Sequence, residues 1–249
     1  MNPNVAHEPI IKIENLYKKY GDNVVLDGFN LNLYQGENLV IMGKSGSGKS
    51  VMIKCLIGLE IPDSGTIEIM SQKLEHLSLK ALDEIRAEIG FLFQGSALYD
   101  SMTVRENLEF PLRRHISKFG NVKDTLPLVE EALQNVGLKN VIDLMPNELS
   151  GGMKRRVALA RTLILKPKII IYDEPTTGLD PITSKEIILL MKSVQEKYKT
   201  SSIIITHDVD CARVIANRMI LLIDGKNYAE GTFAELSTSQ DPKVKAFFK

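Results

Sequence analysis

The N-terminal part of the chain alternates apolar and polar residues along two segments, Ile10–Tyr17 and Val24–Leu33. Gly21-Asp22-Asn23 lies between them, and these residue types favour turns. Alternation with a period of two is typical of strands that bury one face. We therefore expect two half-exposed antiparallel strands joined by a short connection.

Short apolar runs follow farther along the chain: Asn38–Met42, Phe91–Phe93, Ile169–Tyr172, Ser202–Thr206 and Met219–Ile223. Runs of this kind suit strands that are covered on both faces. Helical patterns separate the runs, beginning with Ser50–Gly58 after the first of them. Strands that alternate with helices predict a mostly parallel sheet and therefore an α/β fold.

The stretch from Gly95 to about Lys166 has a different pattern. It contains no convincing strand, and it predicts helices over Thr103–Leu112, Lys123–Val136 and Gly152–Leu165. We interpret it as a helical subdomain inserted between two strands of the sheet. The chain then closes with a short amphipathic tail from Asp241, whose adjacent aromatics Phe247-Phe248 either cover the core or contact another chain.

The composition narrows the class of protein. Lys+Arg and Asp+Glu both number 31, so the net charge is zero and gives no support to nucleic-acid binding. The short basic clusters Arg113–Arg114 and Lys154–Arg156 are predicted to be solvated helix faces. No apolar run approaches the ~18 residues needed to span a bilayer, and the N-terminus lacks the regions of a signal peptide. We expect a soluble, cytoplasmic chain that could sit on a membrane by binding another protein.

The metal-binding residue types are sparse. Cys55 and Cys211 lie in apolar or helical contexts, which predicts small buried hydrophobes in a reducing compartment. The 4 histidines do not cluster with other ligand types. A structural metal is therefore not expected.

The most specific motif is Gly43-Lys44-Ser45-Gly46-Ser47-Gly48-Lys49-Ser50, which matches GxxxxGK[ST] at every position. A predicted strand precedes it and a predicted helix follows it, so a merely connecting Gly/Ser-rich loop is a poor alternative. In such a loop, successive backbone N–H groups point at phosphate oxygens, and the helix N-terminus adds its dipole. Lys49 places a cation on the β- and γ-phosphates, and the Ser50 hydroxyl ligates Mg²⁺. The motif predicts a protein that binds and hydrolyses ATP.

A second motif is the apolar strand Ile169–Tyr172 ending in two carboxylates, Asp173 and Glu174. A strand of this kind places Asp173 where it can hold Mg²⁺ through water. Glu174 is then well placed to polarise the attacking water. The alternative is that the paired acids only cap the next helix.

Leu149-Ser150-Gly151-Gly152-Met153-Lys154-Arg155-Arg156 resembles the signature motif of ATP-binding cassette (ABC) ATPases. Ser150, Gly151 and Gly152 present N–H groups at a helix N-terminus, which makes a second anion site on one chain. In the family, two subunits pair head to tail, and each signature closes over the partner's ATP. The resemblance therefore implies a homodimer that sandwiches two Mg-ATP molecules.

Further positions match the family one at a time. Tyr20 matches the aromatic that stacks on adenine, although it could be a packed strand tyrosine. Gln94 matches the glutamine that touches Mg²⁺ and water and begins the loop that senses the membrane partner. Asp180 matches the aspartate that communicates across the dimer. His207 matches the switch histidine that contacts the γ-phosphate and supports Glu174.

The resemblance covers the chain from about Ile11 to Gly231. It implies an α/β, ABC-type P-loop nucleotide-binding domain with a RecA-like core, an N-terminal antiparallel β subdomain and an inserted α-helical subdomain. Met153 stands where the family usually has Gln, and it lacks the polar groups with which that Gln contacts nucleotide. Ser150 and Gly152 carry the main phosphate contacts in the family, so hydrolysis is still expected. The single domain, 1–249, divides into an antiparallel part (10–35), the RecA-like core (36–94 and 166–231), the helical part (95–165) and the tail (232–249).

No transmembrane segment is fused to this sequence, so the permease is expected to be a separate chain. The SGG-Met signature, the run Phe93–Val104 and the ending Asp241–Val244 are similar to the subfamily that serves Mla-type lipid transporters. These transporters work with proteins of the mammalian-cell-entry (MCE) family. The resemblance implies phospholipid movement between bacterial membranes, with the chain peripheral on the cytoplasmic face of the inner membrane.

Other functions stay open at this point. The chain could serve an importer or exporter of another small solute, such as a polar amino acid. A non-transport ABC protein acting on DNA or ribosomes usually carries two cassettes or a long coiled-coil insertion, and this sequence has neither. A degenerate cassette that binds ATP without turnover is disfavoured because Glu174 and His207 are intact.

Overall fold

The computed structural model describes residues 8–115 and 124–248. Two compact units make up this part of the chain. The first unit comprises the described residues up to Arg86 and those from Ser201 onward, and the second unit spans Ala87–Thr200.

The first unit contains an antiparallel sheet with the strand order β2-β1-β4-β5. The strands are β1 (Ile11–Tyr20), β2 (Asn23–Leu33), β4 (Ser64–Ile69) and β5 (Gln72–Lys73). The predicted N-terminal pair is confirmed, because β1 and β2 run antiparallel with Ile11 opposite Leu33. β4 and β5 extend the antiparallel part beyond residues 10–35, since Ile69 pairs with Ile11 on the other side of β1.

A second, mixed sheet in the first unit has the order β10-β9-β3-β8. Its strands are β3 (Asn38–Met42), β8 (Ser201–Ile205), β9 (Arg218–Ile223) and β10 (Lys226–Gly231). β3 pairs in parallel with both β8 and β9, and every residue of β3 and β8 is buried. The apolar runs therefore predicted these strands correctly. β10 pairs antiparallel to β9 and is half exposed, which is why it carries no apolar run.

The helices of the first unit lie between its strands and after the last of them. They are α1 (Lys49–Leu56), α2 (Leu79–Ala87, ending at the unit boundary), α8 (Val209–Ile215), α9 (Phe233–Ser237) and α10 (Pro242–Lys245). Thr232 and Glu235 form a capping box at α9, and Asp241 caps α10. Phe248 meets Phe233 edge to face with ring centroids 5.5 Å apart, so this tail aromatic packs within its own chain.

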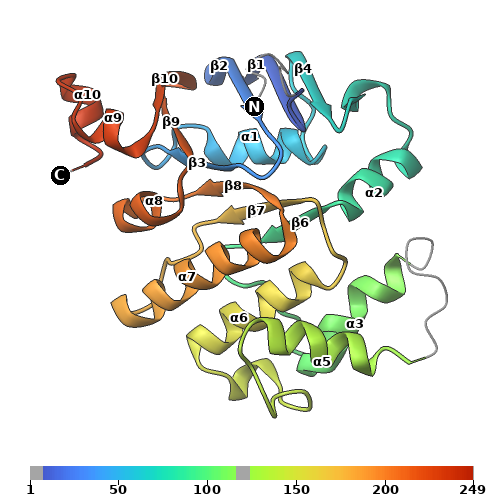
Figure 1. Cartoon of the computed structure of the whole chain (residues 1–249). Helices are drawn as coiled ribbons and strands as arrows, with labels where there is room; N and C mark the ends of the chain where they lie inside the picture. The colour runs from blue at the N-terminus through green and yellow to red at the C-terminus, as the bar shows by residue number, and fades with distance from the viewer. Residues whose placement is uncertain (1–7, 116–123, 249) are drawn as a thin grey trace, which may run out of the picture. The chain divides into compact units, whose positions relative to one another are not determined.

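The second unit contains a parallel strand pair and a helical group. The elements are β6 (Ile89–Leu92), α3 (Val104–Arg114), α5 (Leu126–Asn135), α6 (Gly151–Leu163), β7 (Ile169–Asp173) and α7 (Pro181–Tyr198). α3, α5 and α6 pack on one another, as the helical pattern predicted (Figure 1). The prediction that one helix starts at Lys123 falls outside the described residues. Among residues 8–115 and 124–248, every helix is too short or too polar to cross a membrane.

Candidate nucleotide-binding site

The loop Gly43–Gly48 connects the buried strand β3 to α1, as the motif predicts. Gly48 has a φ of 105°, and a Cβ atom there would lie 2.6 Å from the carbonyl oxygen of Val25. A Cβ at Gly43 would lie 2.8 Å from the carbonyl oxygen of Leu222. Only glycine fits at these two positions, because the loop backbone packs directly against β2 and β9.

Lys49 begins α1, and its Nζ donates hydrogen bonds to the carbonyl oxygens of Gly43 at 2.6 Å and Lys44 at 2.9 Å. The ammonium group is thereby held over the loop itself. Ser50 follows in the first turn of α1 and is exposed, and this turn contains no acidic residue. A helix N-terminus without a carboxylate, preceded by a tight loop and a lysine, fits a phosphate group.

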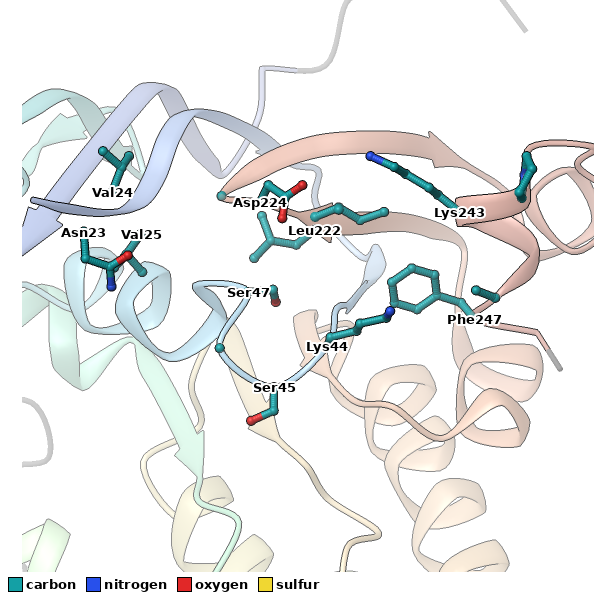
Figure 2. Close-up of a pocket in the computed structure, with 15 residues that line it drawn as sticks. Asn23, Val24, Val25, Lys44, Ser45, Ser47, Leu222, Asp224, Lys243 and Phe247 are labelled. Atoms are coloured by element: carbon teal, nitrogen blue, oxygen red, sulfur yellow. The ribbon is translucent and has the colours of Figure 1, made fainter.

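A cavity of about 740 Å³ lies beside the first half of this loop. The loop residues 44–47, the start of β2, the turn between β9 and β10 and the C-terminal tail all line it. Figure 2 shows the Lys44 side chain extending toward the Phe247 ring, with Lys243 and Asp224 on the cavity wall. The sequence did not predict this cavity, because four segments from both ends of the chain form it.

Tyr20 and His207 also belong to the first unit. Tyr20 ends β1 with 46% of its surface exposed, and the Lys18 ammonium lies 5.3 Å from its ring centroid. Nearly half of the residue's surface is therefore accessible, and its stacking on adenine stays a prediction. His207 is exposed and lies two residues after the end of β8. The backbone there is ordered by Thr206, whose hydroxyl oxygen accepts a hydrogen bond from the Asp208 amide at 3.0 Å.

In the second unit, β7 ends at Asp173, and Glu174 follows with a φ of 49°. This left-handed conformation is uncommon for a residue with a side chain, and such strain is often found at functional sites. Thr177 secures the turn, since its hydroxyl donates to Glu174 Oε2 at 3.1 Å and its amide donates to the Glu174 carbonyl at 3.2 Å. The residue that caps the next helix, α7, is Asp180, so the two acids are not its cap.

Ser150 and Asp180 are both helix N-caps in the second unit. The Ser150 hydroxyl oxygen accepts from the Met153 amide at 3.2 Å at the start of α6. Asp180 accepts from the Ile182 and Thr183 amides and from the Thr183 hydroxyl. The Thr183 hydrogen bonds, first of all the hydroxyl, lower the pKa of Asp180, so its carboxylate stays charged. A Cβ at Gly152 would lie 2.7 Å from Thr183 Cγ2, so the glycine lets α6 and α7 approach closely.

Gln94 is exposed in the turn that follows β6. Fully buried Asn107 of α3 organises the loop after it, accepting from the Tyr99 amide at 2.9 Å and donating to the carbonyl oxygens of Tyr99, Met102 and Thr103. Arg161 of α6 donates to the carbonyl oxygens of Ser96 and Ala97. Neither Asn107 nor Arg161 was predicted from the sequence to support this loop.

The structure corrects the prediction made for the basic cluster Lys154–Arg156. It was expected to be a solvated helix face, but Arg155 is only 4% exposed. Helical periodicity explains the difference, because Ala158, Leu159 and Thr162, which share one face of α6 with Arg155, are also buried. A run of basic residues therefore cannot be placed on the surface from its charge alone.

The predicted site residues are divided between the two units. The first holds Tyr20, the loop Gly43–Ser50 and His207, and the second holds Gln94, Ser150–Gly152, Asp173, Glu174 and Asp180. A buried parallel strand that turns through glycines into a helix beginning Lys-Ser defines a P-loop nucleotide-binding protein of the α/β class.

Comparison with known proteins gives the family. The sequence profile described as ABC transporter matches residues 26–177. The intermembrane phospholipid transport system ATP-binding protein MlaF of Haemophilus influenzae is 40% identical over 98% of this chain and 91% of its own length. The methionine import ATP-binding protein MetN of Campylobacter jejuni is 36% identical over 96% of this chain and 75% of its own length.

Solved structures agree with the sequence relatives. The ATP-binding cassette MJ0796, in a dimeric post-hydrolysis state bound to ADP and Pi, has a TM-score of 0.80 and 36% identity, covering 90% of this chain and 98% of that chain. CbiO1 from Clostridium perfringens, part of the ABC transporter complex cbiONQ, has a TM-score of 0.82 and 30% identity. The match covers 96% of this chain and 94% of that chain. The chain therefore belongs to the ABC transporter family. It binds ATP and is an ATPase, the ATP-hydrolysing subunit of a transporter.

Proposed function

We propose that this ATPase drives the movement of phospholipids between bacterial membranes. The observation that carries the proposal is the 40% identity over 98% of the chain to a protein named for intermembrane phospholipid transport. The SGG-Met signature and the run Phe93–Val104, which are similar to the Mla-type subfamily, support the same cargo.

The working assembly in this proposal contains a second copy of the chain in head-to-tail contact and a separate transmembrane permease. An MCE-domain lipid-binding protein completes it. The dimeric state of the MJ0796 cassette supports the homodimer. The chain then lies on the cytoplasmic face of the inner membrane, held there by the permease.

ATP is held by several groups of this chain. The Tyr20 ring stacks on the adenine, while the amides of the loop 43–48 and Lys49 neutralise the β- and γ-phosphates. Ser150–Gly152 of the partner subunit add a second set of amides at a helix N-terminus. Electrostatic groups that are already oriented in this way supply most of the catalysis of phosphoryl transfer.

Ser50, Gln94 and Asp173 would hold Mg²⁺, because hydroxyl, amide and carboxylate oxygens are the donors that this ion prefers. The ion, when bound, supplies charge neutralisation at the phosphates. Glu174 orients and polarises the attacking water, and His207 supports Glu174 at the γ-phosphate. Asp180 transmits closure across the dimer from its place at the start of α7.

The catalytic assignment is tested by two substitutions in the full-length chain. Glu174→Gln should lower steady-state ATP turnover at least about 100-fold while ATP binding persists. Lys49→Ala should weaken ATP binding roughly tenfold or more, because a charged contact to phosphate is lost. Lys54→Ala, an exposed lysine on the same helix, is the control for Lys49 and should bind ATP normally. Normal ATP turnover by Glu174→Gln would show that Glu174 does not polarise the attacking water.

The cargo is tested by purifying the tagged chain from membranes of its own host. Recovery with a permease and an MCE-domain protein, and ATP turnover that responds to phospholipid, supports the lipid function. The second candidate is import of a small solute, which the 36% identity to a methionine importer subunit favours. Recovery with an amino-acid permease instead would overturn the lipid proposal.

A further inference from the structure

Arg155 is a buried charged side chain in the middle of the signature helix α6, and it is 4% exposed. Its hydrogen-bond partners among the described residues are two backbone carbonyl oxygens. Nη1 donates to Phe93 at 2.7 Å, and Nη2 donates to Thr177 at 3.3 Å. Burial lowers the pKa of Arg155, which reflects the cost of removing a cation from water. A buried cation without a carboxylate is an expensive way to fill space, so its contacts need another explanation.

The two carbonyl groups belong to two separate parts of the predicted site. Phe93 directly precedes Gln94 in the chain. Thr177 lies in the turn that begins at Glu174 and leads toward Asp180 at the start of α7. Arg155 therefore joins α6 to the segment that carries Gln94 and to the segment that carries Glu174, all within the second unit.

The contact continues to the Glu174 carboxylate. Thr177, whose carbonyl accepts from Arg155, donates its own hydroxyl to Glu174 Oε2 at 3.1 Å. Glu174 has a φ of 49°, a conformation that persists only where the surrounding structure holds it. Two hydrogen bonds, one to the backbone and one from the side chain of Thr177, therefore link the signature helix through this residue to the strained Glu174.

We propose that Arg155 is a positioning residue that acts through Thr177 to hold the Glu174 carboxylate, and through Phe93 to hold Gln94, in a fixed relation to α6. The inference rests on the proposed function, which makes Glu174 the water-polarising group. A shift of the signature helix then moves both segments with it. Nucleotide affinity is largely unaffected, because the phosphate loop and Tyr20, which hold ATP in the proposed function, belong to the first unit and are not part of this set of hydrogen bonds.

The first test compares Arg155→Met with Lys185→Met in steady-state ATP hydrolysis by the full-length chain. Methionine keeps the apolar stem of Arg155 and removes its donors, so kcat should fall about tenfold or more while KM for ATP stays within about twofold. Lys185 is an exposed residue of α7, and its variant should retain normal turnover. A wild-type kcat for Arg155→Met, or a change confined to KM, would overturn the inference.

Thr177 provides a second test that does not depend on how well Arg155→Met folds. Thr177→Val is isosteric but lacks the hydroxyl, and it should lower kcat, whereas Thr177→Ser keeps the donor and should restore turnover to near the wild-type rate. In the double variant Arg155→Met/Thr177→Val, kcat should match the more severe single variant, because both act through one contact. If kcat of the double variant falls by the product of the two single reductions, the inference is contradicted. Equal kcat values for Thr177→Val and wild type would also contradict it.

Glu174→Gln distinguishes failure of the water-polarising role of Glu174 from failure of the positioning role of Arg155. If Glu174→Gln hydrolyses ATP at the normal rate, the proposed role of Glu174 fails and the positioning role fails with it. If Glu174→Gln is inactive while Arg155→Met and Thr177→Val retain the wild-type kcat, only the positioning role fails. Loss of turnover in all three variants, with KM unchanged, is the expected result.

Discussion

Arg218 donates two hydrogen bonds to the carboxylate of Glu37, from Nε at 2.8 Å and from Nη2 at 3.0 Å. The guanidinium group also bonds to Glu230 and to the carbonyl oxygen of Asn32. Glu37 lies directly before β3, and Arg218 is the first residue of β9. The bond to Glu37, supported by Glu230, outweighs burial and raises the pKa of Arg218. The pair therefore links the start of β3, which leads into the phosphate loop, to the start of β9, which packs against Gly43 of that loop.

Arg218→Lys should lower the free energy of unfolding by about 1.5 to 3 kcal/mol. Lysine cannot reproduce the paired donors of a guanidinium, so the partly buried carboxylate of Glu37 loses one of its two hydrogen bonds. Lys226→Gln is the control, because Lys226 meets Asp27 at 2.8 Å with side chains 60% and 45% exposed. An exposed pair of this kind contributes about 1 kcal/mol or less. Urea unfolding of both variants tests the difference, and equal losses would refute it.

Tyr172→Phe should leave the protein equally stable or stabilise it by about 1 kcal/mol. Tyr172 is 1% exposed, and its hydroxyl has no hydrogen-bond partner among the described residues. Burial strongly raises the pKa of this phenol. Thr162→Val is the opposite case, since the Thr162 hydroxyl donates to the carbonyl oxygen of Ala158 at 2.9 Å. The midpoint temperature of thermal unfolding should be higher for Tyr172→Phe than for Thr162→Val. The reverse order would show that the Tyr172 hydroxyl has a hydrogen-bond partner.

Glu109→Gln should lower the free energy of unfolding at neutral pH, and this destabilisation should disappear in acid. Burial alone would raise the pKa of Glu109, but hydrogen bonds from Arg105 and Thr125, both at 2.7 Å, lower it below the ordinary 4.5. A lowered pKa in the folded state means that the stabilisation is complete above pH 4.5 and is lost as the pH falls through the lower, folded value. Urea midpoints measured along this pH range should converge for wild type and Glu109→Gln. Glu130→Gln, a substitution of an exposed residue of α5, is the control and should leave the urea midpoint at neutral pH near the wild-type value.

Cys55 should resist alkylation in the native protein. Burial, with a smaller effect from Glu60, raises the pKa of its thiol to about 11, and only 1% of the residue is exposed. At about pH 8 the reactive thiolate is therefore scarce as well as inaccessible. Mass spectrometry after iodoacetamide treatment should find Cys55 unmodified until guanidinium is added. Rapid labelling of the native protein would show that α1 opens readily.

The strands that the pattern predicted well are those whose burial is complete. In β3 and β8 every residue is buried, and in β7 all but Asp173, so the environment of each strand is visible in its own residues. β4, β5 and β10 were missed because they are partly exposed and take their structure from pairing with β1 or β9. Strand formation of this second kind depends on a neighbour that lies elsewhere in the chain.

The sequence by itself determined the phosphate loop, since strand, glycines, lysine and helix are contiguous and their conformations are set by local sterics and hydrogen bonds. It also determined the family, because the motifs occur in one order along one chain. Only the tertiary structure decided the environment of Arg155, whose partners are 62 and 22 residues away in sequence, and the contact of Thr177 with Glu174. The physical reason is that helical periodicity specifies which face of α6 is apolar. It does not specify which distant carbonyl groups that face will meet.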